Sequence, residues 1–451
     1  MKINLKNLGL LDEANFEIGD FTIICGENNT GKTYATYAFY GFWKRIYDII
    51  KFIAYENKDK FISDDNDKKI YIDINLFQNL LKELPELINK YYQSTIYQIL
   101  AGKEDDFKQS ICNIEIEIFE INEIPQTPIS LFQITQENKK IYFKFNDDKI
   151  NSNNYIVFIL LLFIKNIPNV EIISVERTGA SMFYKELNLN KNNILEAITR
   201  ANEKNMFEDI NNILKKSSSR YPKPVTDNIE TIQNLDEIEK NSSFILKNPD
   251  EYKNIIDLLW QIIGGKYIID DAGIKFATGV KKRIGKNNKV IALQQASSSV
   301  KALMLLNFYV LNSAKKGDIL IIDEPELNLH PKNQILLARL FVMLINAGIK
   351  IFITTHSDYI IREISNCICL NNLENENISN LKNYSKNYKL ESHRVKAYIA
   401  KNEKGKNILE NVKITQTDGI FMDTFNEVID KQNQNQEQIY LAMSKALDGN
   451  K

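Results

Sequence analysis

The sequence predicts an α/β fold, in which a mixed core sheet is flanked by helices and carries a further antiparallel part. Short apolar stretches with the length of buried strands alternate with helical patterns along the chain. A middle stretch alternates polar and apolar residues, as antiparallel strands do. Two mostly helical blocks interrupt the core as insertions. The apolar strands are predicted at residues 21–25, 170–175, 319–322 and 349–354, the antiparallel strands within 112–150, and the helices at 33–53, 75–100 and 185–264.

The chain has 451 residues, which corresponds to two to three domains or to one large domain with insertions. We expect the N-terminal residues to form an edge strand, residues 57–70 a loop, and the last eighty or so residues a polar periphery. The predicted segments are the first part of the core (1–45), a helical insertion (46–110), antiparallel strands with the following core strand (111–180), a helical lobe (181–264), the second part of the core (265–400) and a peripheral segment (401–451).

The composition excludes several classes of protein. With 44% hydrophobic and 25% charged residues, the chain is neither disordered nor fibrous. Its 57 Lys and Arg residues balance 58 Asp and Glu residues, which argues against a surface that coats nucleic acid or an anionic membrane. Four scattered cysteines predict a reducing, cytoplasmic environment, and three histidines nearly exclude a His-rich metal centre.

No segment of the sequence predicts a membrane partner. The N-terminus lacks the continuous apolar core and the small-residue cleavage site of a signal peptide. The longest apolar run, residues 155–164, would rise about 15 Å as a helix, which is half of a hydrocarbon core. We therefore expect this run to be a buried element.

A phosphate-binding loop is predicted at residues 26–33, GENNTGKT, which match the pattern G-x-x-x-x-G-K-[ST] between a strand and a helix. The glycines let the backbone wrap a phosphate, and the loop N–H groups meet its charge. Lys32 would reach the β- and γ-phosphates, and the Thr33 hydroxyl would ligate Mg²⁺. The alternative is a chance glycine-rich turn. The residues assigned to the nucleotide here are Gly26, Asn28, Asn29, Gly31, Lys32, Thr33 and Tyr34.

Two acids end the apolar strand that begins after Asp318. Asp323 would hold Mg²⁺ through water, and Glu324 would polarise the attacking water as a general base. The carboxyl ends of strands are where α/β sheets bind ligands, which favours this role. The alternative is an acid pair that caps the next helix.

His356 follows the next apolar strand, in the sequence ITTHSDYII. At the ligand edge of the sheet, a neutral imidazole would contact the γ-phosphate and the attacking water. A single histidine is more often structural, but its position one crossover after the acid pair favours function. His330 is expected only to lead into a helix that has Pro331 at its first position.

A serine run, Ser297, Ser298 and Ser299, directly precedes an apolar helix. Two interpretations stay open. Serines in this place cap helices, because their hydroxyls accept hydrogen bonds from free backbone N–H groups. The same N-terminus would also bind a phosphate that another subunit presents.

These motifs and their order resemble the ABC-type ATPases, within them the SMC/Rad50-like and OLD-like branch. GENNTGKT, LIIDEPELNLHP and ITTHSDYII are similar to that branch's phosphate loop, Walker B strand and switch histidine, and ASSSVKAL lies at the place of the signature motif. The resemblance implies an ATPase with ATP and Mg²⁺ as cofactors, whose catalytic residues are Lys32, Glu324 and His356. It also implies a homodimer that sandwiches ATP, with the serine run acting in trans, and higher homo-oligomers built from it.

The chain departs from that family at two motifs. Serines stand where the signature motif usually has glycines, and the place of the Q-loop has Glu176 and Arg177 instead of glutamine. Glu176 and Arg177 are therefore assigned to the nucleotide site, with a structural ion pair as the alternative.

Within the branch, the sequence resembles the stand-alone ATPase subunits of bacterial anti-phage systems, the AriA-like ATPases of PARIS and the PtuA-like ATPases of Septu. This resemblance implies a slow ATPase that responds to a phage-derived trigger and controls a separate effector, a nuclease or a toxin. The residues after His356 contain no Asp-x-Asp pair, so we expect no nuclease site in the chain itself.

Two other functions remain open. The basic stretch with Lys281, Lys282 and Arg283 would contact a nucleic-acid backbone if the chain is a DNA-repair or SMC-like ATPase, although such a stretch is more often a solvated hairpin turn. A transporter ATPase is a weaker alternative, because the span from Gly26 to Ser297 is too long for a compact transporter head.

Overall fold

The main sheet of the protein has nine strands in the order β6-β1-β2-β16-β15-β3-β14-β13-β9. The computed structural model describes residues 1–64, 69–123, 132–145, 152–184, 221–279, 289–421 and 423–448. The strands are β1 (Lys2–Leu8), β2 (Leu11–Glu17), β3 (Phe21–Gly26), β6 (Ile111–Ile114), β9 (Val170–Ile173), β13 (Ile319–Asp323), β14 (Lys350–Thr355), β15 (Val395–Glu403) and β16 (Lys406–Asn411). The strands β15, β3, β14, β13 and β9 run parallel, whereas β6, β1 and β2 are antiparallel. The predicted α/β fold with a mixed sheet is confirmed.

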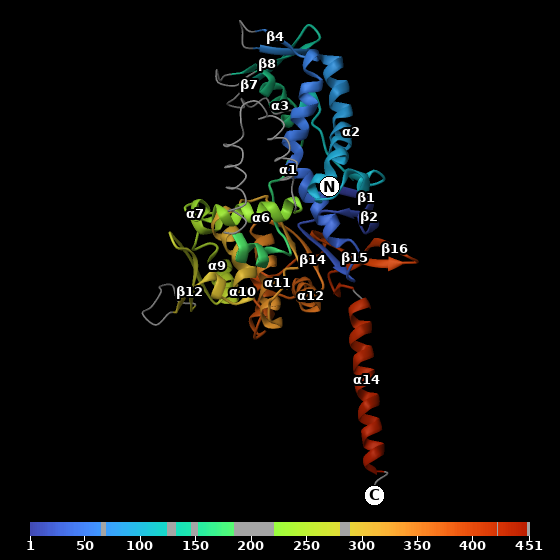
Figure 1. The fold of residues 1–451 in the computed structure, drawn as a ribbon, viewed down its shortest axis with the longest axis vertical. Coiled ribbons are helices and arrows are strands. Elements are labelled where there is room, and N and C mark those ends of the chain that lie inside the picture. Colours follow the sequence, from blue (N-terminus) through green and yellow to red (C-terminus); the bar gives the residue numbers. More distant parts are fainter. Residues whose placement is uncertain are drawn as a thin grey trace, which may run out of the picture.

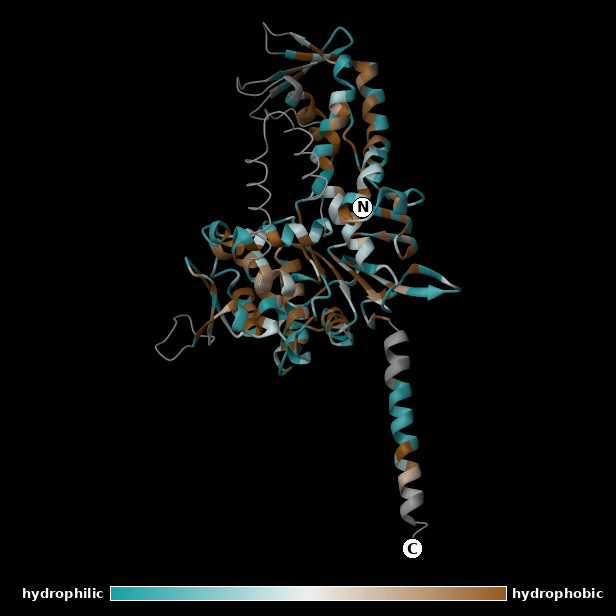
Figure 2. Cartoon of the chain, viewed as in Figure 1, coloured by the Kyte–Doolittle hydropathy of each residue, from teal (hydrophilic) through white to brown (hydrophobic). Residues whose placement is uncertain are grey.

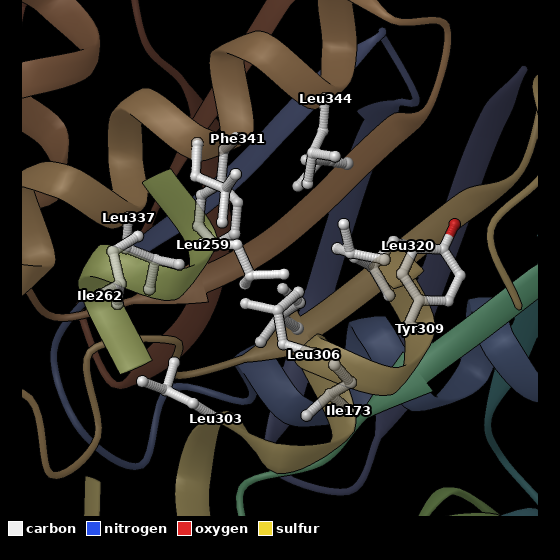
Figure 3. Close-up of a cluster of buried hydrophobic side chains, with 14 of the residues drawn as sticks. Ile173, Leu259, Ile262, Leu303, Leu306, Tyr309, Leu320, Leu337, Phe341 and Leu344 are labelled. Atoms are coloured by element: carbon white, nitrogen blue, oxygen red, sulfur yellow. The ribbon is translucent and has the colours of Figure 1, made fainter. Parts of the chain in front are cut away.

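The main sheet separates two hydrophobic cores. Successive side chains of β3 face opposite ways, so Ile23 belongs to one core and Ile24 to the other. The first core (Figure 3) lies under α6 (Lys223–Gln233), α9 (Lys253–Ile263), α10 (Ser298–Phe308), α11 (Pro331–Asn346) and α12 (Asp358–Leu370). The second lies under α1 (Lys32–Glu56), α2 (Ile74–Ile99) and α3 (Ser152–Leu162). In Figure 2 hydrophobic residues lie on strands between these layers, whereas the projecting strand β16 is largely hydrophilic.

A protrusion built on α1, α2 and α3 rises from the sheet (Figure 1). A four-stranded antiparallel sheet of order β4-β5-β8-β7 covers its end. Its strands are β4 (Ile62–Asp64), β5 (Lys69–Asp73), β7 (Phe132–Glu137) and β8 (Lys140–Phe145). The side chain of Asp73 caps α2 by accepting hydrogen bonds from the backbone N–H groups of Asn75 and Leu76. The expectation that residues 57–70 form a loop is wrong, because they include β4 and the start of β5.

The helical lobe lies before the second part of the core. Besides α6 and α9 it contains α7 (Leu235–Ile238) and α8 (Phe244–Lys247), and the hairpin strands β10 (Gly265–Asp270), β11 (Gly273–Thr278) and β12 (Val290–Ala292) follow it. Pro222 and Pro224 lie at the start of α6, where a missing N–H group costs no helical hydrogen bond. The predicted helix before them, residues 185–220, and the basic residues Lys281, Lys282 and Arg283 lie outside the described residues.

The C-terminal part of the chain contributes to the centre of the main sheet. Strand β15 pairs in parallel with β3 and antiparallel with β16. The expectation that the last eighty or so residues are peripheral is therefore wrong for these two strands. The remaining elements are α13 (Asn375–Ser379), β17 (Ile414–Thr415), β18 (Gly419–Ile420) and α14 (Asp423–Asp448), which projects from the body in Figure 1.

Two further expectations from the sequence can be compared with the structure. Strand β1 is not at the edge of the sheet, because β6 pairs with it on the side opposite β2. The apolar run 155–164 lies mostly in α3, which packs against α1.

In the part of the chain that the structure describes, no helix combines the length and the hydropathy needed to cross a membrane. The short helical turns are η1 (Lys58–Lys60), η2 (Glu104–Phe107), η3 (Ile121–Glu123), η4 (Leu293–Gln295), η5 (Tyr309–Ser313), η6 (Lys386–Tyr388) and η7 (Ser392–Arg394).

Candidate functional site

The predicted motifs meet at the carboxyl edge of three neighbouring parallel strands. Strand β14 lies between β3 and β13, with Thr355 opposite Cys25 and Thr354 opposite Asp323. The phosphate loop, the acid pair and His356 follow these three strands, so the sheet register itself brings them together.

The phosphate loop connects β3 to α1 and fits tightly against the rest of the sheet. Gly26 has φ +127°, and a Cβ atom there would lie 2.0 Å from the carbonyl oxygen of Ala400 in β15. Gly31 has φ +88°, and a Cβ atom there would lie 2.7 Å from the Cβ of Leu11. Both positions therefore require glycine, for conformational reasons and for space.

Lys32 lies inside this loop. Its side-chain ammonium donates hydrogen bonds to the carbonyl oxygens of Gly26, at 3.3 Å, and Glu27. Burial lowers the pKa of Lys32, and the negative charges of Glu324 and Asp323 oppose this shift. The loop thus holds a buried cation at the place where phosphate oxygens would be its anionic partners.

Asp323 is 1% exposed at the end of β13. Its Oδ1 accepts a hydrogen bond from the Thr354 hydroxyl, whereas its Oδ2 is buried and has no hydrogen-bond partner among the residues described. Burial raises the pKa of Asp323 to about 6, while the hydrogen bond from Thr354 and the nearby Thr33 hydroxyl act in the opposite direction. A buried carboxylate oxygen without a donor fits a site that a cation or its water completes.

The donor set near Asp323 fits Mg²⁺ when substrate phosphates contribute. No group of three or more His, Cys, Asp or Glu side chains arranged for a metal ion occurs in the described ranges. Thr33 and Asp323 would therefore hold Mg²⁺ together with phosphate oxygens and waters, as this ion prefers.

Glu324 has a strained backbone with φ +48°. A left-handed conformation costs a non-glycine residue about 1–3 kcal/mol, so surrounding contacts must hold it. Its N–H donates to the carbonyl oxygen of Thr354 at 3.1 Å and faces the hydroxyl of the same residue at 3.1 Å. Its side chain, 31% exposed, places Oε1 3.5 Å from Nε2 of His356. The hydrogen bond with His356 lowers the pKa of Glu324, which keeps this carboxylate ionised at neutral pH.

Glu326 was not predicted, and it holds the backbone that carries His356. Its Oε1 accepts from the N–H of His356 at 2.6 Å, and its Oε2 accepts from the Thr355 hydroxyl at 2.9 Å. Burial raises the pKa of Glu326. The Ser357 hydroxyl then caps α12 by accepting from the N–H of Ile360.

The Q-loop residues differ in their positions. Glu176 is exposed, and the hydroxyl of Tyr37 donates to its Oε2 at 3.2 Å. Arg177 is 2% exposed, and its guanidinium donates to the backbone carbonyls of Asp323, at 2.8 Å, and Glu324, at 2.6 Å. The prediction that Arg177 contacts the nucleotide directly is therefore corrected: its donors point at main-chain oxygens behind the acid pair.

The serine run begins α10. The Ser297 hydroxyl caps this helix through the N–H of Val300 at 3.4 Å, so the capping interpretation is confirmed for this residue. The hydroxyl of Ser299 lies 2.8 Å from that of Ser297, and Ser298 is exposed. A phosphate contact in trans stays a prediction.

The other predicted residues lie around the phosphate loop or away from it. Asn28 and Asn29 are exposed on the loop, and the carbonyl oxygen of Asn29 accepts from the Asn407 side chain at 3.3 Å. The ring of Tyr34 packs against Gly9, in the turn before β2. His330 is the N-cap of α11, which begins at Pro331, as the sequence predicts.

Sequence reasoning missed Thr354, Glu326 and the support of the loop by β15. The sequence contains a signal for Thr354 and another for Glu326. Threonines directly before His356 place hydroxyls at the ligand edge, and Glu326 lies two residues after the predicted base. No local signal links β15 to the loop, because almost the whole chain separates them.

A phosphate loop that faces an acid pair and a histidine across parallel strands defines a P-loop nucleotide-binding fold. The chain belongs to the AAA ATPase domain family (AAA_15), which it matches over residues 1–361.

Three of the solved structures to which the chain is similar are SMC heads. The chain is 13% identical to the Smc head bound to the C-winged helix domain of ScpA, with a TM-score of 0.34, covering 92% of this chain and 98% of that one. It is 12% identical to the Smc head with an extended coiled coil bound to the C-terminal domain of ScpA from Pyrococcus furiosus (TM-score 0.32; 97% and 98% covered) and 11% identical to the SMC head domain from Thermotoga maritima (TM-score 0.30; 92% and 98% covered). No curated protein matches the sequence.

Proposed function

We propose that this chain binds and hydrolyses ATP with Mg²⁺, and that ATP closes two copies into a dimer that controls a separate effector. The observation that carries the proposal is the convergence of Lys32, Asp323, Glu324 and His356 at one sheet edge. Lys32 is close enough to Glu324 and Asp323 for their charges to act on it, and His356 lies beside Glu324.

We assign the roles of the residues as follows. Lys32 and the loop N–H groups bind the β- and γ-phosphates, and Thr33 and Asp323 hold the metal ion. Bound Mg²⁺ supplies charge neutralisation of the phosphate oxygens. Glu324 accepts the proton of the attacking water, and His356 orients its carboxylate at 3.5 Å.

The trans contribution comes from α10. The first N–H groups of an α-helix have no partner within the helix, and those of Ser298 and Ser299, with the exposed Ser298 side chain, would meet the γ-phosphate bound by the partner copy. One nucleotide would therefore contact both copies, and the dimer would form when ATP is bound.

We further propose that the dimer controls an effector in anti-phage defence. Only the resemblance of the sequence motifs supports this role. The expected partners are a nuclease or toxin and a phage-derived trigger. The test is phage infection of cells that carry the wild-type gene and its neighbouring genes, compared with cells in which the gene encodes Lys32→Ala. Equal phage yields from both would reject the defence role.

Glu324→Gln tests the ATP switch. It removes the proton acceptor but keeps the shape of the side chain, so ATP should bind and persist. We expect closed dimers on mass photometry with ATP and Mg²⁺, and the wild-type assembly without nucleotide. A variant that keeps its nucleotide-free assembly state at saturating ATP contradicts the sandwich.

Mixing two inactive variants tests the trans contact. Lys32→Ala removes the phosphate-binding ammonium in cis, and Ser298→Glu places a negative charge where the partner's γ-phosphate would lie. Each alone should lose turnover. A co-expressed mixture should regain activity, because one of its two sites combines an intact loop with an intact serine run. Absence of recovery contradicts the serine run's role.

A further inference from the structure

Arg177 is buried beneath the candidate site and binds main-chain oxygens from several segments. Its Nε donates to the carbonyl of Ala302 at 3.2 Å, and its Nη1 to that of Ser174 at 3.0 Å. The same Nη1 donates to Asp323 at 2.8 Å, and Nη2 to Glu324 at 2.6 Å. One side chain therefore joins the residue after β9, the end of β13 and a turn of α10.

The neighbouring Ser181 strengthens this connection. Its hydroxyl lies 2.7 Å from the carbonyl oxygen of Arg177 and 3.5 Å from that of Lys301 in α10. The main chain around Arg177 and α10 is thus tied at two successive helical residues, Lys301 and Ala302.

α10 itself is fixed by apolar packing. Leu303 and Leu306 of α10 belong to the same buried cluster as Leu259 and Ile262 of α9 (Figure 3). Because buried cores are close-packed, α10 can move only as a unit with its contacts. The hydrogen bonds of Arg177 and Ser181 to the first turns of α10 therefore help to determine the direction of its N-terminus, which carries the serine run.

We propose that Arg177 is a positioning residue that holds the Glu324 backbone in its left-handed conformation and couples it to α10. The water-activating carboxylate and the serine run offered to a partner copy then keep one fixed relation. This inference rests on the proposed ATPase function. Arg177 would influence catalysis through the positions of Glu324 and α10, without contacting the nucleotide itself.

The chemistry of arginine suits this position. A guanidinium is planar, permanently charged and carries five N–H donors, so it can serve four carbonyl oxygens at once. Lysine offers a single ammonium that cannot reach them together. Burial lowers the pKa of Arg177, and the surrounding carboxylates, Asp323, Glu326, Glu324 and Glu176, favour its charged form.

The test compares Arg177→Lys and Arg177→Met with the full-length wild type in steady-state ATPase assays. We expect kcat to fall at least about tenfold while KM for ATP stays within about twofold, because the residue orders the base and not the bound nucleotide. In the Glu324→Gln background, Arg177→Met should also reduce the ATP-dependent dimer on mass photometry. Ser181→Ala is the milder variant and should lower kcat less, with unchanged KM.

Arg339→Met is the control for loss of a largely buried arginine that pairs with an acid elsewhere in the fold, with 11% of its side chain exposed. Arg339 pairs with Glu363 at 2.6 Å between α11 and α12, away from the site. It should lower the melting temperature but leave kcat near wild type. Unchanged kcat in the Arg177 and Ser181 variants, or an equal fall in the control at equal loss of melting temperature, overturns the positioning role. A wild type without ATP turnover would instead reject the proposed function.

Discussion

The Nε2 atom of His356 lies 3.5 Å from Oε1 of Glu324, and each residue is held by a different support. Thr354 binds the backbone of Glu324, whereas Glu326 binds the backbone of His356. The pair is therefore fixed through the main chain of two neighbouring strands before any ligand binds. Such preorganisation is what a proton acceptor beside a charged substrate requires.

Replacement of His356 by Ala should lower turnover without weakening ATP binding. The hydrogen bond that orients the Glu324 carboxylate is lost, while Lys32 and the loop are untouched. We expect kcat to fall about 10²-fold, with the ATP dissociation constant from fluorescence titration unchanged. His330→Ala is the control, because His330 caps α11 and should affect only stability. Equal turnover of the two variants would contradict the assignment.

Replacement of Lys32 by Ala should weaken nucleotide binding. A charge-assisted contact to phosphate is lost, so calorimetry should show ATP binding weakened at least about tenfold. Lys44→Ala is the matched control on the same helix: Lys44 pairs with Glu171 at 3.3 Å and lies outside the loop. Wild-type affinity in the Lys32 variant would show that the ammonium has another role.

Asp323→Asn should stabilise the nucleotide-free protein at pH 7 while abolishing Mg²⁺-dependent turnover. The pKa of Asp323 is raised from its ordinary value of 3.8 to about 6. Between these values the folded state holds a proton that the unfolded chain has lost, so this carboxylate lowers stability as pH rises through that window. Above pH 6 the destabilisation from ionising the buried Asp323 carboxyl reaches its full value. The substitution should then raise the free energy of unfolding by up to about 3 kcal/mol.

Denaturant titrations at pH 7 and pH 4 measure this effect, and the gain should shrink at the lower pH. Asp318→Asn is the control, at the residue directly before the same strand. Asp318 is likewise buried, at 2% exposed, but its oxygens accept hydrogen bonds from Asn169, Tyr309 and the N–H of Lys315. Its replacement should destabilise the protein by about 1–3 kcal/mol. A loss of stability in both variants would mean that the Asp323 carboxylate is satisfied in the folded protein.

The sequence predicts those parts of the site that are local in the chain. A strand that ends in Gly26, and a strand that ends in Asp323, can be recognised from a few neighbouring residues, and the rule for carboxyl edges brings them together. Arg177 could not be assigned in this way. A charged residue after a strand suggests an exposed ligand contact, and its burial depends on carbonyl oxygens more than a hundred positions away.

Contacts between residues distant in the sequence also explain why β15 was not predicted as a core strand. Its lysine and asparagine residues suggest a solvated segment, while its small and apolar side chains, among them Ala397 and Ala400, are buried against β3. A strand of mixed composition can lie at the centre of a sheet, because its neighbours cover its backbone and its apolar face. When such a neighbour is far away in the sequence, as β3 is from β15, only the three-dimensional structure reveals the pairing.

Gly26→Ala tests whether β15 forms the floor of the phosphate loop. The new Cβ atom would meet the carbonyl oxygen of Ala400 at 2.0 Å, and the φ of +127° disfavours any side chain. Gly317 is the control: it has φ +88°, and its Cβ atom would meet nothing within 4 Å. Gly317→Ala should cost about 1 kcal/mol and leave ATP affinity intact, whereas Gly26→Ala should cost more and weaken ATP binding. If both lost the same stability and both bound ATP normally, β15 would not shape the loop.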